Sequence, residues 1–160
     1  MSMRLVAWAC ALSLLVVGCG GDDAAATCVE LREPEDQASG QHVLGEGTVE
    51  YQTSPPTSGP HIAGPTPEGV LDAGVPPEIQ VRVLESGGVM VQYDDAVLGA
   101  ELEQLRSIGS RSIVVAPATS PLPARIVATA WTWKLSCSAV DLRTLEAFAA
   151  ERPADAPGLD

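Results

Sequence analysis

The segment that decides the fold is Val89–Ile108, "VMVQYDDAVLGAELEQLRSI". Its first five residues, ending at Tyr93, alternate with period two, which predicts a β-strand. Leu98, Leu102 and Leu105 then recur at helical spacing, which predicts an amphipathic helix. The two aspartates between the halves are expected to cap that helix. A strand followed directly by a helix indicates a chain that mixes both kinds of element.

The residues before this segment predict more strands and one long loop. Residues 79–83, "IQVRV", also alternate, and two glycines separate them from the strand at 89–93, so a β-hairpin is expected. Residues 42–51 are expected to form one or two short strands. Residues 53–77 are rich in proline and glycine and predict a long irregular loop. Such a loop inside a compact domain is usually functional or wraps the core.

The residues after this segment complete the predicted fold. Residues 112–117 form a short strand candidate, and residues 125–135 form a longer one in which Trp131 and Trp133 share a face. Asp141 is expected to cap a second helix that carries leucine and phenylalanine at helical spacing. The order of strands, helix, strands and helix predicts an α+β fold with a mainly antiparallel sheet and two helices.

The N-terminus predicts export and lipidation. Residues 1–18 carry one positive charge and then an apolar run too short to span ~30 Å of hydrocarbon, which is typical of a signal peptide. The end of this run resembles a bacterial lipobox, which implies cleavage before Cys19 and its modification with acyl chains such as palmitate. An ordinary secretory signal and an uncleaved anchor are the alternatives. We expect a lipid-anchored flexible tether at 19–40, one globular domain at 41–152 and a tail at 153–160.

Charge and cysteine content restrict the function further. The formal net charge is −12, which argues against nucleic acid as a partner. Cys28 and Cys137 remain after the signal and the lipidated cysteine are set aside, and an exported protein most often pairs such residues as a disulfide. Two free thiols are the alternative. Neither cysteine lies in a CxxC motif, so the sequence does not support a redox role.

The stretch "PPTSGPH" at 55–61 is the most constrained part of the predicted loop. Prolines fix φ and glycine adopts conformations that other residues do not, so His61 leaves a backbone with little freedom. A metal ligand or an acid–base group needs such fixed placement. The alternative is a rigid turn whose histidine bonds to backbone. Ser58 beside His61 suggests a hydrolase, but the chain has no G-x-S-x-G motif. The motif residues are Pro55, Pro56, Thr57, Ser58, Gly59, Pro60 and His61.

Together with "LESGGV" at 84–89 and "TAW" at 129–131, this stretch resembles the bacterial family of domain of unknown function 3105. The resemblance covers about residues 40–150. In that family the second motif reads V-H-x-L-E-H-G-G-V, which implies two histidines that accompany the one ending the first motif. No activity is established for the family, so the resemblance implies no reaction.

The chain departs from that pattern where it matters for a metal. Arg82 and Ser86 stand at the two histidine positions, and the donors that remain are His42, His61 and Glu85, with Met90 as a further candidate. Such a set suits copper or zinc, although a permanent positive charge nearby opposes a cation. An ion pair between the arginine and the glutamate is the alternative. The residues of this second motif are Arg82, Glu85, Ser86, Gly87 and Gly88.

These observations predict a membrane-anchored envelope lipoprotein that faces the periplasm or the cell surface. Its small domain is expected to be non-enzymatic, with no catalytic residue, no cofactor and a binding or structural role toward a protein or ligand partner that the sequence does not identify. The alternative is a periplasmic copper- or zinc-binding domain with a degenerate histidine site.

Overall fold

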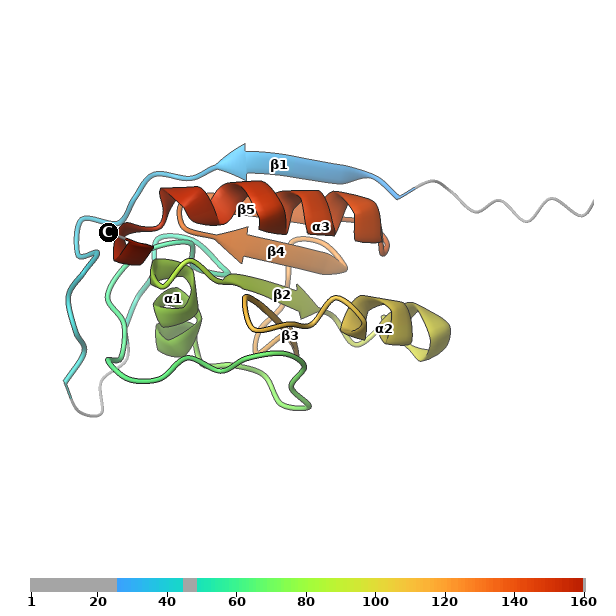
Figure 1. Ribbon diagram of the computed structural model, residues 1–160, viewed down its shortest axis with the longest axis horizontal. Coiled ribbons are helices and arrows are strands. Elements are labelled where there is room, and N and C mark those ends of the chain that lie inside the picture. Colours follow the sequence, from blue (N-terminus) through green and yellow to red (C-terminus); the bar gives the residue numbers. More distant parts are fainter. Residues whose placement is uncertain (1–25, 45–48, 160) are drawn as a thin grey trace, which may run out of the picture.

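The computed structural model describes residues 26–44 and 49–159 (Figure 1). The predicted signal peptide and the lipidation at Cys19 lie outside these residues. None of the described helices combines the length and apolar character that crossing a membrane requires.

A five-stranded mixed sheet forms the centre of the domain, in the order β1-β5-β4-β2-β3. Only β2 and β3 pair in parallel, and the other three pairings are antiparallel. The α+β prediction is therefore confirmed, but the sheet is mixed. The strands are β1 (Cys28–Arg32), β2 (Val89–Tyr93), β3 (Ile113–Pro117), β4 (Ile126–Ala130) and β5 (Trp133–Cys137).

The described residues contain three α-helices, where the sequence analysis expected two. They are α1 (Pro77–Glu85), α2 (Gly99–Arg106) and α3 (Leu142–Glu151). Helix α2 lies in the connection between β2 and β3. Parallel strands need such a crossover, because a tight turn can join only antiparallel strands. The aspartates after β2 do not cap it, because Leu98 is its N-cap residue and makes no side-chain bond. The Asp141 cap of α3 is confirmed: its Oδ1 accepts the Thr144 amide at 3.0 Å.

Helix α1 shows that the hairpin prediction at residues 79–83 is wrong. Its buried residues follow helical rather than strand spacing: Gln80, Val81, Val83 and Leu84. The two glycines end this helix instead of turning a hairpin. Gly87 has φ +79° and donates to the Leu84 carbonyl, and Gly88 donates to the Val83 carbonyl at 2.9 Å. Together these bonds satisfy carbonyls at the helix end, as in a Schellman motif.

The long strand predicted at 125–135 is a hairpin of β4 and β5. Trp131 and Thr132 form the turn, and Thr132 has φ +60°. The two tryptophans therefore do not share a face. Trp131 is buried on the α1 side of the sheet, whereas Trp133 packs against the opposite cluster and lies 4.3 Å from the guanidinium of Arg152.

Strand β1 lies within the segment expected to be a flexible tether. It pairs with β5 in a register that places Cys28 opposite Cys137, and these residues form the predicted disulfide. At the other end, residues 152–159 form two short 3₁₀-helices, Arg152–Asp155 and Pro157–Leu159. Ala156, which lies between these two helices in the segment predicted as a tail, is buried in the same apolar cluster as residues of α1.

Two apolar clusters cover opposite faces of the sheet. Val89 and Val91 of β2 belong to the cluster that contains residues of α2 and α3, whereas Met90 belongs to the cluster of α1. Residues 53–76 run as a long irregular segment beside α1 (Figure 1), as predicted, with isolated bridges from Val70 to Val115 of β3 and from His61 to His42. Among the described residues of 42–51, only His42 makes a bridge, to His61.

Candidate functional site

The PPTSGPH stretch, which we call the signature loop (residues 55–61), is held in the domain by its own polar groups. Thr57 is buried, and its hydroxyl donates to Glu33 Oε2 at 2.8 Å. The other carboxylate oxygen, Oε1, lies 2.7 Å from the ammonium of Lys134, which is only 5% exposed. The Thr57 carbonyl also accepts the amide of Thr132 at 2.9 Å. A buried ion pair and a backbone bond therefore tie this loop to β5 and its turn.

The second half of the signature loop is held in the same way. The Ser58 hydroxyl accepts a hydrogen bond from the Asp36 amide at 2.8 Å, so the side chain that suggested a hydrolase is part of a structural contact. The Tyr51 hydroxyl donates to the Pro60 carbonyl at 2.7 Å, and burial raises the pKa of Tyr51 above its usual range. Gly59 has φ +126°, and a Cβ there would lie 3.0 Å from the Tyr51 ring. Glycine is thus required at this position both for conformation and for space.

His61 ends the loop as a fully buried side chain. Its Nε2 lies 2.8 Å from Glu85 Oε2, and Arg82 Nη1 lies 3.0 Å from the same oxygen. The predicted Arg82–Glu85 ion pair is thereby confirmed. Neither ring nitrogen makes a well-directed hydrogen bond to a described residue. Burial lowers the pKa of His61, and the nearby His42 and Arg82 lower it further against the opposing effect of Glu85. Burial therefore favours the neutral form of this imidazole.

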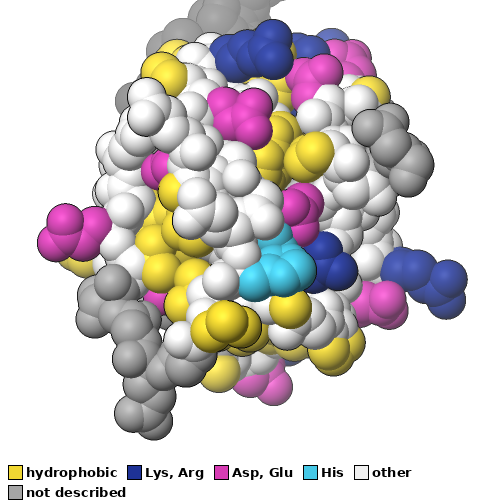
Figure 2. All heavy atoms as spheres, turned by 90° about the vertical axis from the view of Figure 1, so that its left-hand side faces the viewer, with side chains coloured by type: hydrophobic (Ala, Val, Ile, Leu, Met, Phe, Trp, Pro, Cys, Tyr) yellow, Lys and Arg dark blue, Asp and Glu magenta, His cyan; other side chains and the backbone are white. Residues whose placement is uncertain are grey.

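His42 is the exposed member of this group. Its ring meets that of His61 edge to face, with 4.9 Å between centroids, and the His61 backbone bonds to the residues on either side of it. Figure 2 shows histidine at the surface, beside acidic and basic side chains, near the middle of this face. The structure thus brings together His42, His61 and Glu85.

The charges around this group oppose the binding of a metal cation. The Glu85 oxygen that faces His61 is already paired with the guanidinium of Arg82. A metal would have to displace that cation or accept its charge nearby, which is unfavourable. In the part of the chain that the structure describes, no three His, Cys, Asp or Glu side chains are arranged to hold a metal.

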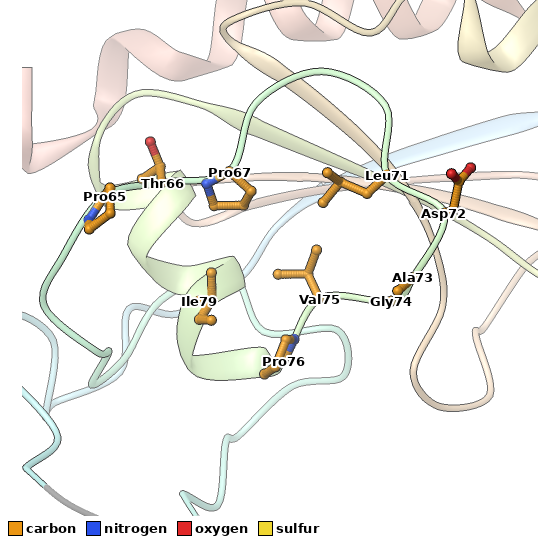
Figure 3. Close-up of a pocket in the computed structure, with 10 residues that line it drawn as sticks. All are labelled: Pro65, Thr66, Pro67, Leu71, Asp72, Ala73, Gly74, Val75, Pro76 and Ile79. Carbon is orange, nitrogen blue, oxygen red and sulfur yellow. The ribbon is translucent and has the colours of Figure 1, made fainter.

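A larger hollow lies between α1 and the segment that follows the signature loop. This groove has a volume of about 660 Å³, and its lining is almost entirely apolar. Figure 3 shows it bordered by the first turn of α1 and by residues 65–76, which we call the groove loop. Asp72 is its single ionisable lining residue, and that carboxylate pairs with Arg106 at 2.9 Å. The apolar side chains that line it are Pro65, Pro67, Leu71, Ala73, Val75, Pro76 and Ile79.

A smaller pocket of about 180 Å³, which we call the polar pocket, lies beside the α1 N-terminus, and its lining is about half polar. Its walls include the first two prolines of the signature loop. Gln80 and Gln92 line it as buried residues, and Gln92 Nε2 donates to Gln80 Oε1 at 3.0 Å. Its remaining polar lining consists of hydroxyl groups: Tyr51, Thr53, Ser54, Thr119 and Ser120.

The sequence analysis missed both hollows and the lysine that holds the signature loop. Lys134 is the only lysine of the chain, and it falls in an otherwise uncharged run, which was an available signal. Gln80 and Gln92 interrupt apolar runs in the same manner. The groove had no such signal, because its lining comes from a loop and a helix that was taken for a strand.

Comparison with known families finds a match. A family model described as protein of unknown function (DUF3105) matches residues 42–158, which includes the signature loop, α1 and both hollows. No match was found among curated proteins or among solved structures.

Proposed function

This chain belongs to the DUF3105 family, and we propose that it is an envelope lipoprotein whose domain binds the apolar part of a ligand without catalysing a reaction. The apolar groove carries this proposal. A hollow of about 660 Å³ with an apolar lining is within the size range of ligand sites. An apolar ligand in it would remove this lining from water, which lowers the free energy.

The polar groups near the groove support a non-enzymatic role. The one ionisable side chain in its lining, Asp72, is neutralised by Arg106 and is itself highly exposed. A desolvated or perturbed acid–base group is what a catalytic pocket usually contains, and this lining has none. The polar residues of the signature loop, in turn, hold that loop to the domain.

Ligand binding is tested by calorimetric titration of residues 19–160 carrying Cys19→Ser, which keeps every described element. With 1-octanol as the probe, we expect binding that weakens about tenfold in Ile79→Gln, equivalent to about 1.4 kcal/mol. Leu98→Gln is the matched control, since Leu98 is 67% exposed and lies outside the groove. An absence of binding, or an equal loss in both variants, would overturn the proposal.

Membrane attachment is a separate part of the proposal and rests on the sequence around Cys19. Several acyl chains on one residue hold a protein stably on a membrane, whereas one chain does not. Cys19→Ser should therefore move the full chain from the membrane fraction to the soluble fraction after cell lysis. Retention in the membrane fraction would contradict lipidation at this residue.

The copper or zinc alternative remains testable on the same protein. Three of its predicted ligands lie together, but the Arg82 guanidinium shares the oxygen that faces His61. Elemental analysis of protein purified without a chelating tag decides between the two. A stoichiometric metal that is lost in His61→Ala would favour the metal site over the ion-paired cluster.

A further inference from the structure

We propose that the ligand is an amphiphile whose apolar chain lies in the groove and whose uncharged polyhydroxy head lies in the adjoining polar pocket. This inference rests on the proposed function and adds the chemical class of the ligand.

The two hollows share a thin wall, the segment Gly74–Pro77. Its first three residues line the groove, and the last one lines the polar pocket. The Val75 carbonyl accepts a hydrogen bond from Gln80 Nε2 at 2.6 Å, so a groove residue contacts a pocket residue directly. On the same wall, a Cβ on Gly74 would lie 2.6 Å from Thr119 Cγ2, which belongs to the pocket lining. Both hollows are open to the surface on either side of this wall, so one molecule that lies over it can reach both.

The pocket has no charged group to pair with a charged head. Its ionisable lining residue is Tyr51, which stays protonated at neutral pH because burial raises its pKa. A carboxylate, phosphate or ammonium placed here would lose hydration without an opposite charge in return, which costs several kcal/mol or more. The formal net charge of −12 further disfavours an anionic head.

The buried glutamines leave hydrogen-bonding capacity for a hydroxyl. Gln92 Nε2 uses one of its two hydrogens on Gln80 Oε1, and each amide oxygen accepts one bond where it has two lone pairs. A spare donor beside spare acceptors matches hydroxyl groups, each of which both donates and accepts. The hydroxyls of Thr119 and Ser120 at the pocket rim extend the same chemistry.

The volume limits the size of the head. A pocket of about 180 Å³ corresponds to about six water molecules at ~30 Å³ each. That volume suits a head built on one small polyol or one sugar ring. The groove is between three and four times larger and is suited to the chain.

The test compares ligands that share an octyl chain: octyl β-glucoside, octanoate and octyltrimethylammonium, each below its micelle concentration. Calorimetric titration of residues 19–160 with Cys19→Ser should give the glucoside at least about fivefold tighter binding than either charged compound. Gln92→Leu should reduce that ratio to about one. Thr119→Val, at an exposed rim position, serves as a second variant that should reduce the ratio without touching the core. Leu98→Gln is again the control and should leave every affinity as it is.

The outcomes separate this inference from the proposed function. Equal affinities for the three octyl compounds, together with 1-octanol binding that depends on Ile79, would overturn the amphiphile and leave the proposed function standing. Glucose alone binding as tightly as its octyl derivative would also overturn the inference, because the chain would then contribute nothing. Failure of every octyl compound, 1-octanol included, would overturn the proposed function and this inference with it.

Discussion

The signature loop and the groove loop are separated only by residues 62–64, and both are irregular and rich in proline and glycine, yet they relate to the domain in opposite ways. In the signature loop, Thr57, Ser58 and His61 are buried, and each has a polar contact with a residue outside the loop. In the groove loop, the backbone around Val70 bonds to β3, and apolar side chains border an open hollow.

This difference shows that proline content by itself does not reveal what a loop does. Proline and glycine set the backbone of both loops, but the partners of the side chains distinguish a structural loop from one that presents a surface. The signature loop gives its polar groups to the fold, whereas the groove loop leaves its apolar groups available. We therefore expect perturbations of the first to affect stability and perturbations of the second to affect binding.

The largest contrast is expected between two ion pairs. Lys134→Met removes the partner of Glu33, whose side chain is 12% exposed, and should lower the free energy of unfolding by about 3–5 kcal/mol in urea titrations. Arg106→Met breaks the Asp72 pair at the groove, where the aspartate side chain is 90% exposed, and should cost at most about 1 kcal/mol.

A double variant and a direct comparison of the two single variants test this difference between the ion pairs. Adding Glu33→Gln to Lys134→Met removes the uncompensated charge and should recover more than half of the loss. Equal destabilisation by Lys134→Met and Arg106→Met would show that the signature loop is no more dependent on its ion pair than the groove loop is.

The next contrast compares two glycines with positive φ, +126° at Gly59 and +144° at Gly64. Alanine is strained at both, by about 1–3 kcal/mol. At Gly59 the new Cβ also meets the Tyr51 ring at 3.0 Å, whereas at Gly64 it meets nothing within 4 Å. Gly59→Ala should therefore be the more destabilising by at least about 1 kcal/mol in thermal or urea unfolding. A larger effect at Gly64 would contradict the described packing around the signature loop.

The burial of His61 predicts that the free energy of unfolding depends on pH. Because the folded-state pKa of His61 is lowered, the unfolded chain binds more protons below its pKa of about 6.5. Stability should be complete above that pH and should fall as pH drops toward the folded-state pKa, by at most about 1.4 kcal/mol per pH unit. Urea unfolding between pH 7.5 and 5 measures this slope. His61→Gln should flatten it, and an unchanged slope would assign it to other groups.

The smallest stability effect is expected in the groove. Ile79 is half-buried, so Ile79→Gln should change the free energy of unfolding by less than about 1 kcal/mol while it weakens 1-octanol binding. Thermal unfolding of the variant without ligand checks the first part. A loss of several kcal/mol would mean that Ile79 belongs to the core, and the loss of binding would then have a structural cause.

The sequence was sufficient to predict the fold class, the Asp141 cap and the disulfide. It also predicted strands β2 and β3 and the helix between them, α2. It was insufficient at α1, because "IQVRV" alternates over five residues while its burial follows the helix that the preceding prolines begin. It was also insufficient at residues 125–135, where Thr132 adopts a positive φ that its residue type does not signal.

The candidate site was predictable in part for similar reasons. The signature loop placed His61 beside Glu85 and Arg82, as the motifs suggested, because these residues are fixed by the loop and by one helix. The two hollows depend on how segments far apart in sequence meet, such as Gly74 and Thr119. Contacts between residues so far apart in the chain cannot be predicted from the spacing of residues in the sequence.

The measurement that tests the central claim most directly is residue-resolved NMR of residues 19–160 with Cys19→Ser, titrated with 1-octanol. Our account predicts saturable chemical-shift changes concentrated at the groove, at Leu71, Val75 and Ile79, with little change at Thr57 and His61. Changes concentrated at His42, His61 and Glu85, with the groove unaffected, would contradict it and would make the signature loop the binding site.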